Sequence, residues 1–204
     1  MMDRRELLKM IGMATGAAFV GNAIAWTSVA EATSPKAAGF SKEDLMLLNE
    51  VAETIIPRTD TPGARDADVG RIMAVLVADC YLPEEQQVFR QGMVKINNTS
   101  ESVFGKPFLL LNNTERQDLL ADLNQQAYSY NRENRVAFWE LGNPGSKPGQ
   151  EVSLPHYFTL FKQLSLFGFF TSKAGATQVL RYVAVPGRYD GEYPYKKGDR
   201  AWAT

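Results

Sequence analysis

The sequence predicts an all-α fold: a single compact domain of about five to seven helices that ends in an irregular C-terminal strap. Three observations favour this class. Apolar residues recur at helical spacing in several segments, prolines and glycines separate those segments, and no stretch alternates apolar and polar residues for long enough to require a strand. The chain has 204 residues, of which 45% are hydrophobic, and this is enough for one domain with its own core.

The first 32 residues are predicted to be an export signal that precedes this domain. A short charged region is followed by a weakly apolar run that glycines dilute, and an A-x-A triplet at its end offers a cleavage site. The stretch "DRRELLK" resembles the twin-arginine pattern, with Arg4 and Arg5 as the arginine pair, although Asp stands first and Leu replaces Phe. The alternatives are an amphipathic first helix or an uncleaved anchor, but the apolar run is shorter than the roughly 20 residues of a membrane span.

Three parts of the chain therefore follow one another. Residues 1–32 form the twin-arginine-type signal, and residues 33–40 form a flexible spacer of small residues. The helical domain covers residues 41–204 and includes the strap, residues 183–204, where Pro and Gly interrupt any helical period.

Local sequence features predict where each helix begins and ends. The first helix starts after Ser41, a good N-cap, and Pro57 stops it. Glu50 and Glu53 are interpreted as its solvated face. The later helices are expected over residues 69–81, from Pro83 past Val94, after a capping box of Thr114 with Gln117, from Pro155 to Phe170, and briefly after Thr171 or Ser172.

Composition argues against most catalytic and cofactor-binding classes. The net charge is −1 with no basic block, so no nucleic-acid partner is expected. One histidine and one cysteine do not suffice for zinc, covalent haem or an iron–sulfur cluster, and no phosphate-binding glycine motif is present. His156 is interpreted as a surface or capping residue. Cys80 follows the apolar spacing of its helix, so it is either a buried thiol or the site of a disulfide to another subunit.

An excess of apolar and aromatic side chains stands out instead. Residues 157–170 carry more apolar positions than one helix face uses, so this helix is either central in the domain or meets a partner with its second face. The aromatic strap covers either a partner or its own domain. Aromatic residues and arginine are enriched at protein interfaces, and the candidate partner interface is Phe161, Phe167, Phe169, Phe170, Arg188, Tyr189, Tyr193, Tyr195 and Trp202.

These segments together resemble a known family. The resemblance lies in the leader, in "LNEVAETIIPRTDTPGARDADVG" (residues 48–70), in "LLNNTERQDLLADLN", and in "GFFTSKAGATQVLRYVAVPGRYDGEYP" (residues 168–194). The chain is similar to the small third subunit of gluconate 2-dehydrogenase and of related FAD-dependent sugar dehydrogenases. Some members carry a cysteine just after the "GRYDG" turn, where this chain has Glu192, so a disulfide made there is not expected here.

The resemblance implies a non-catalytic subunit of a periplasmic complex. The large subunit of such a complex is an FAD-containing dehydrogenase of the glucose-methanol-choline type, and a multi-haem cytochrome c subunit accepts the electrons at the membrane. The small subunit stabilises the flavoprotein and escorts it through twin-arginine export, and it binds no cofactor itself. It reaches the membrane only through the complex. The alternative is an independent periplasmic ligand-binding protein or enzyme, with a concave pocket of its own.

Overall fold

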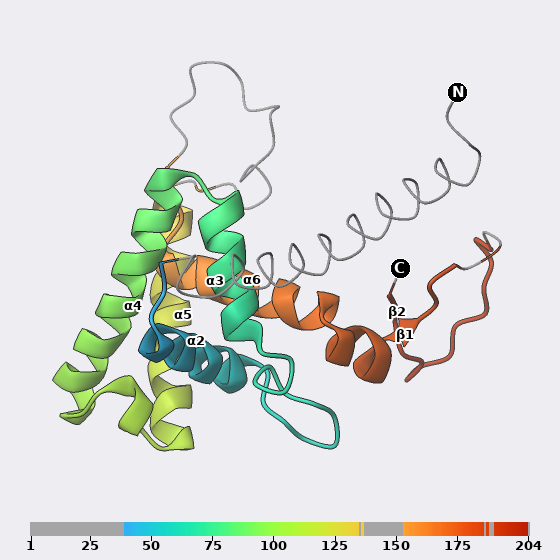
Figure 1. The fold of residues 1–204 in the computed structure, drawn as a ribbon, viewed down its shortest axis with the longest axis horizontal. Helices are drawn as coiled ribbons and strands as arrows, with labels where there is room; N and C mark the ends of the chain where they lie inside the picture. Colours follow the sequence, from blue (N-terminus) through green and yellow to red (C-terminus); the bar gives the residue numbers. More distant parts are fainter. Residues whose placement is uncertain (1–38, 135, 137–152, 186, 188–189, 204) are drawn as a thin grey trace, which may run out of the picture.

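The computed structural model describes residues 39–134, 136, 153–185, 187 and 190–203, and it shows a helical body from which a C-terminal arm projects (Figure 1). The expected all-α class and the irregular C-terminal region are confirmed. The predicted export signal and spacer lie outside the described residues, apart from Gly39 and Phe40. The elements are α2 (Lys42–Ile55), α3 (Val69–Cys80), α4 (Pro83–Phe104), the 3-10 helix η1 (Phe108–Leu110), α5 (Asn113–Glu133), α6 (Tyr157–Thr171), the π-helical turn η2 (Gly175–Val179), and the strands β1 (Arg181–Tyr182) and β2 (Trp202–Ala203).

The first helix begins where its cap predicts. The Ser41 hydroxyl accepts a hydrogen bond from the backbone N–H of Asp44 at 3.1 Å, and the Asp44 carboxylate accepts one from the Ser41 N–H at 2.8 Å. This reciprocal pair satisfies two donors that a helix start leaves free. α2 ends at Ile55, two residues before Pro57.

The start of α5 differs from the prediction. The capping box is formed by Asn112 and Glu115, with N–H···O distances of 2.9 Å and 2.8 Å, and not by Thr114 and Gln117. Two overlapping sequences here both match the pattern, since Asn is at least as good an N-cap as Thr. The backbone takes the earlier one, so Thr114 lies inside the first turn of α5.

The position of Cys80 at the end of α3 corrects the expectation that its thiol is buried. Cys80 is exposed, although its spacing from Met73 and Val77 places it near the apolar face. It is the last residue of α3, and the chain turns away there toward Pro83, which opens α4. The core therefore ends one turn earlier than the apolar spacing suggests.

α6 is the central helix of the body. It packs against α2, α3, α4 and α5, and its rings meet those of α4, with 4.4 Å between the ring centroids of Phe161 and Phe89. The close approach depends on Gly92, because a Cβ there would lie 2.7 Å from Tyr157 and 2.8 Å from Phe161. Among the described residues, no helix has both the length and the apolar character needed to cross a membrane.

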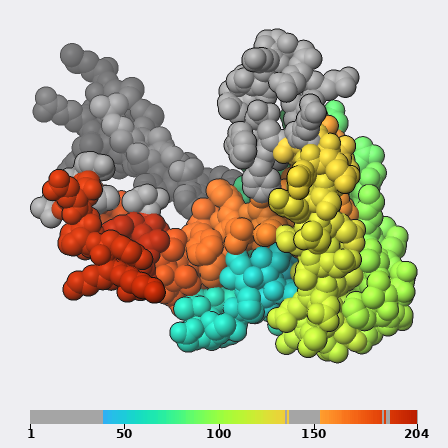
Figure 2. All heavy atoms as spheres, turned by 180° about the vertical axis from the view of Figure 1, so that it is seen from behind, coloured from blue at the N-terminus to red at the C-terminus, as the bar shows by residue number. Residues whose placement is uncertain are grey.

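The C-terminal arm, which we define as the described residues of 172–203, continues from the end of α6. Figure 1 shows η2, β1 and β2 beyond the helical body, and Figure 2 shows the same segment at one edge of the molecule. β1 and β2 pair in parallel, with Arg181 opposite Trp202 and Tyr182 opposite Ala203. A two-residue strand is too short for an alternating pattern, and for this reason the sequence gives no strand signal here.

Candidate functional site

The arm leaves the body through a tight turn that only glycine permits. Ser172, which is buried, donates its hydroxyl to the Phe169 carbonyl at 2.6 Å and accepts from the Gly175 N–H at 3.0 Å. A Cβ at Gly175 would lie 2.0 Å from the Phe169 carbonyl oxygen, well inside contact distance. The turn therefore fixes where the arm starts relative to α6.

Three side chains form a small cluster within the arm. The Arg181 guanidinium lies 4.6 Å from the ring centroid of Trp202 and 5.8 Å from that of Tyr193, and it donates a hydrogen bond to the Tyr193 hydroxyl at 3.2 Å. The Tyr193 and Trp202 rings meet edge to face, with 5.5 Å between their centroids. Cation–π and edge-to-face contacts of this kind hold an irregular segment together without a large core.

The described part of the strap folds back on the base of the arm. The Arg181 N–H donates to the Ala201 carbonyl at 2.7 Å, and the Arg200 guanidinium donates to the Gln178 carbonyl at 3.1 Å. The strap thus lies against residues 178–182 and not across the helical body, as Figure 1 also shows. Its outer face is left open to solvent.

Exposed apolar side chains gather on this arm and on the last turns of α6. Of the fifteen large hydrophobic side chains that are exposed in the described part of the chain, seven lie between residues 167 and 202. Tyr195 is 76% exposed and Phe167 is 56% exposed. We call the set the arm surface, and its members are Phe167, Phe170, Tyr182, Val185, Tyr193, Tyr195 and Trp202. Exposed apolar groups gathered in one region mark a site of association more often than scattered ones do.

Two residues of the predicted interface do not reach this surface. Phe161 and Phe169 are buried, because they share one helix face with the buried Ser165 at a spacing of four residues. Phe167 and Phe170 lie on the opposite face of α6 and are exposed. This burial corrects the predicted surface by removing Phe161 and Phe169 from it. Arg188 and Tyr189, like Arg4 and Arg5 of the leader, lie outside the described residues.

A polar clamp connects α2 to the loop that follows it. This clamp was not predicted from the sequence. The Glu53 carboxylate accepts from the Arg58 N–H at 3.0 Å and from the Arg65 N–H at 2.8 Å. Gly63 is required there, because a Cβ would lie 2.5 Å from the Glu53 carboxylate and 2.6 Å from the Arg58 nitrogen. One side chain therefore holds both ends of the loop.

Glu50 completes this clamp, and the expectation of a solvated face is wrong. Its side chain is 18% exposed and pairs with Arg65 at 2.7 Å and with Arg116 of α5, whose side chain is 13% exposed. Arg116 also donates to the Leu109 carbonyl at 2.8 Å. The sequence carries no clear signal of this pairing, because the loop of residues 56–68 holds two arginines and three aspartates of its own. The carboxylates of Glu50 and Glu53 therefore both hold the loop in place.

The single histidine caps a helix, as one of its two interpretations expected. His156 Nδ1 accepts from the Phe158 N–H at 3.3 Å, and the ring centroid lies 5.6 Å from that of Tyr130 and 4.2 Å from that of Tyr157. Burial, with a smaller contribution from Lys95, lowers the pKa of His156. Burial raises the pKa of Tyr157 to about 12. Within the described ranges, no three His, Cys, Asp or Glu side chains converge as metal ligands would.

Comparison with known proteins identifies the family. Neither the curated proteins nor the solved structures contain a match to the chain. A family model described as Gluconate 2-dehydrogenase subunit 3 matches residues 42–187, which include the clamp, the central helix and the base of the arm. This match spans well over half of the sequence. The chain therefore belongs to the gluconate 2-dehydrogenase subunit 3 family.

Proposed function

We propose that this chain is the non-catalytic small subunit of an FAD-dependent gluconate or sugar dehydrogenase complex. In that role it stabilises the flavoprotein subunit and escorts it through twin-arginine export. The observation that carries the proposal is the arm surface, which exposes aromatic side chains on a segment built to project from the body. A subunit that stabilises another needs such a surface more than it needs a reactive site.

The construction of the arm supports a docking role. Its base is fixed by the Gly175 turn and its interior by the Arg181 cluster, so little conformational freedom remains to be lost on binding. Tyr and Trp are common anchors at interfaces because they bury much area with few rotatable bonds. The arm surface offers Tyr182, Tyr193, Tyr195 and Trp202 in this form.

The proposed partner is a large dehydrogenase subunit of the glucose-methanol-choline type that carries FAD. The chemistry of substrate oxidation belongs to that subunit, and a multi-haem cytochrome c subunit with haem c receives the electrons. The clamp supports the non-catalytic assignment, because Glu50 and Glu53 hold the loop after α2 through their ion pairs and hydrogen bonds. Glu50 and Glu53, which share one face of α2, therefore both have a structural role.

The proposed route of the complex is twin-arginine export to the periplasm, with the leader of this chain serving both subunits. Arg4 and Arg5 are the leader residues on which recognition would depend. This route carries folded proteins, so a partner docked on the arm before export could travel with the chain. Attachment to the membrane would then come through the complex.

Co-expression with the neighbouring flavoprotein tests both parts of the proposal. The flavoprotein should co-purify with this chain and appear in the periplasmic fraction as a soluble, FAD-loaded protein. Arg4→Lys combined with Arg5→Lys should leave both subunits in the cytoplasm while co-purification continues. Lys9→Arg is the matched control, since it changes a leader cation outside the arginine pair.

Three results would contradict the proposal. If the flavoprotein reaches the periplasm equally well with the altered leader, the escort role is wrong. If the flavoprotein is equally stable and active when this chain is absent, the stabilising role is wrong. Substrate turnover by the purified chain alone would oppose the non-catalytic assignment.

A further inference from the structure

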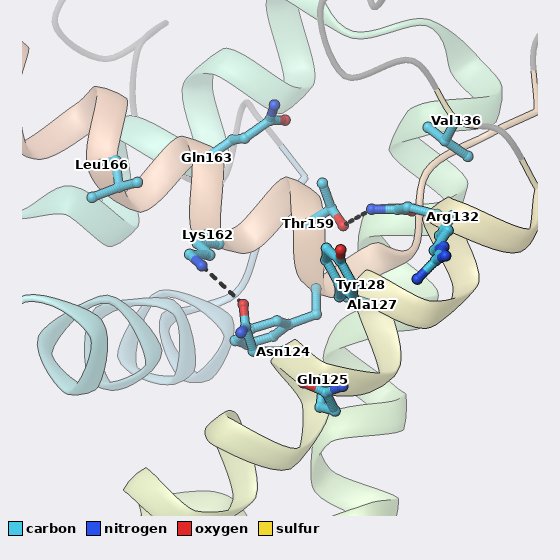
Figure 3. A pocket seen from close by; sticks show the side chains of 12 residues that line it. Asn124, Gln125, Ala127, Tyr128, Arg132, Val136, Thr159, Lys162, Gln163 and Leu166 are labelled. Atoms are coloured by element: carbon cyan, nitrogen blue, oxygen red, sulfur yellow. Dashed lines mark hydrogen bonds between the residues drawn. The ribbon is translucent and has the colours of Figure 1, made fainter.

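A cleft on the helical body lies away from the arm and has no part in the proposed function. It occupies about 730 Å³ between the C-terminal half of α5 and the N-terminal half of α6 (Figure 3). Pockets that hold small organic ligands are commonly about 300 to 1,000 Å³. The cleft is thus large enough for a ligand of ordinary size.

The inner wall of the cleft is apolar and rigid. Phe158 and Ala127 line it and are buried, and Leu166 extends the apolar wall toward its edge. At one end, the Asn131 amide donates to the Thr159 hydroxyl at 2.8 Å and its carbonyl oxygen accepts from the His156 N–H at 3.0 Å. Since these polar groups already satisfy one another, this end is held in place without a ligand.

The charge of the cleft has one sign. Arg132 of α5 and Lys162 of α6 line it, and none of its other lining residues that the structure describes carries a carboxylate. The Lys162 ammonium donates to the neutral amide oxygen of Asn124 at 2.9 Å, and Arg132 forms no ion pair within the part of the chain that the structure describes. Of the nearby acids on α5, Asp122 is bonded to Gln126 and Glu133 lies outside the cleft lining. The described lining therefore presents two cations without an ion-pair partner, beside an apolar wall.

We infer that this cleft binds an amphipathic organic anion, with a carboxylate or similar headgroup at Arg132 and Lys162 and an apolar body against Phe158, Ala127 and Leu166. A charge-assisted hydrogen bond to either cation is stronger than one between neutral groups. A neutral sugar fits less well. It would leave both cations without an anionic partner and would place hydroxyl groups against the buried wall of Phe158 and Ala127.

Octanoate and 1-octanol are the probes that test this inference, because they share a chain length and differ in charge. The purified chain is titrated with each, and amide NMR shifts report both the affinity and the residues affected. We expect one octanoate site with shifts centred on residues 124–132 and 158–166. Octanol should bind there at least tenfold more weakly.

Substitutions separate the two halves of the site. Arg132→Gln with Lys162→Gln should weaken octanoate at least tenfold and change octanol binding less than twofold. Leu166→Asn should weaken both probes. Lys42→Gln with Lys173→Gln is the matched control, since it removes two exposed cations elsewhere, and circular dichroism checks the fold of each variant.

Four outcomes would overturn the inference. Three of them are octanol binding as tightly as octanoate, octanoate affinity that survives Arg132→Gln with Lys162→Gln, and shifts centred on the arm aromatics. Absence of octanoate binding at millimolar concentration would overturn it as well. None of these results depends on whether a flavoprotein partner exists, so failure here leaves the proposed function to its own test.

Discussion

Gly175 and Phe169 lie so close that no side chain fits between them: a Cβ on Gly175 would lie 2.0 Å from the Phe169 carbonyl oxygen. Because that oxygen belongs to the backbone of α6, it cannot rotate away as a side chain would. The Ser172 hydroxyl is bonded to the same carbonyl and to the Gly175 N–H, so the whole turn is determined together. The direction in which the arm leaves the body follows from this contact.

Gly175→Ala is therefore expected to displace the arm while the helical body stays folded. Hydrogen exchange should accelerate at residues 176–182 and remain slow in α2 and α4, and co-purification of the flavoprotein should fall at least fivefold. Thr177→Ala, which alters an exposed residue of the same turn, should change neither. Unchanged exchange in Gly175→Ala would show that the turn tolerates a side chain.

Substitutions on the arm surface should reduce binding of the flavoprotein, whereas substitutions on the buried face of α6 should reduce the stability of the chain. Tyr195→Ser with Phe167→Gln should abolish binding of the flavoprotein and change the unfolding free energy of the chain by less than about 0.5 kcal/mol, because both side chains are exposed. Phe161→Ala should instead destabilise the chain by about 3–5 kcal/mol, since it removes a fully buried ring. Urea unfolding and pull-down distinguish these results. Retained pull-down with Tyr195→Ser and Phe167→Gln would place the interface elsewhere.

Glu50→Gln should destabilise the chain by about 2–3 kcal/mol, because it leaves the poorly exposed Arg116 without its anionic partner. Arg71→Gln is the matched control. It breaks the exposed pair with Asp68, and such pairs contribute about 0–1 kcal/mol. Denaturant midpoints measure both. Adding Arg116→Met to Glu50→Gln should recover part of the loss, and a larger loss in the double variant would contradict this account.

The pH dependence of stability should include a contribution from His156. Its pKa in the folded chain is lowered by burial and by Lys95, so the unfolded chain binds a proton more readily. This contribution is fully present above pH 6.5, the ordinary value, and is lost as the pH falls from 6.5 toward the lowered folded pKa. Protonation of Nδ1 also removes the acceptor of the Phe158 N–H.

His156→Asn keeps a capping oxygen and does not titrate, so it isolates that contribution. The difference in unfolding free energy between pH 7.5 and pH 5 should be smaller in His156→Asn than in the parent chain. Measuring both proteins in the same buffers cancels the carboxylates that titrate in each. An equal pH difference in the two proteins would mean that the cap is indifferent to protonation.

Local chemistry explains which parts of the fold could be predicted. Ser41, Pro57 and Pro83 act on their own neighbours, so the limits of α2 and the start of α4 follow from the sequence. Asn112 shows the limit of such reasoning, because two possible capping boxes overlap in the sequence and only the one of Asn112 and Glu115 forms. The prediction of a single helical domain rests on the helical spacing of apolar residues, a signal that is summed over many positions.

The clamp and the inner contacts of the arm depend on residues far apart in the chain. Glu50 meets Arg116 across 66 positions, and Arg181 meets Trp202 only because the strap turns back. No spacing rule encodes either contact. Phe161 is buried and Phe167 is exposed, although both lie on the same apolar helix. The sequence of such a helix does not show which face is buried, because this depends on the elements that pack against it.

The return of the strap has a practical consequence for anyone who labels this protein. β2, at Trp202–Ala203, pairs with β1 and so helps to close the arm at Arg181. A purification tag fused soon after Ala203 would begin directly beside this contact and crowd the Trp202 ring. A label inserted in an exposed loop of the helical body avoids this, and pull-down experiments on the arm should use one.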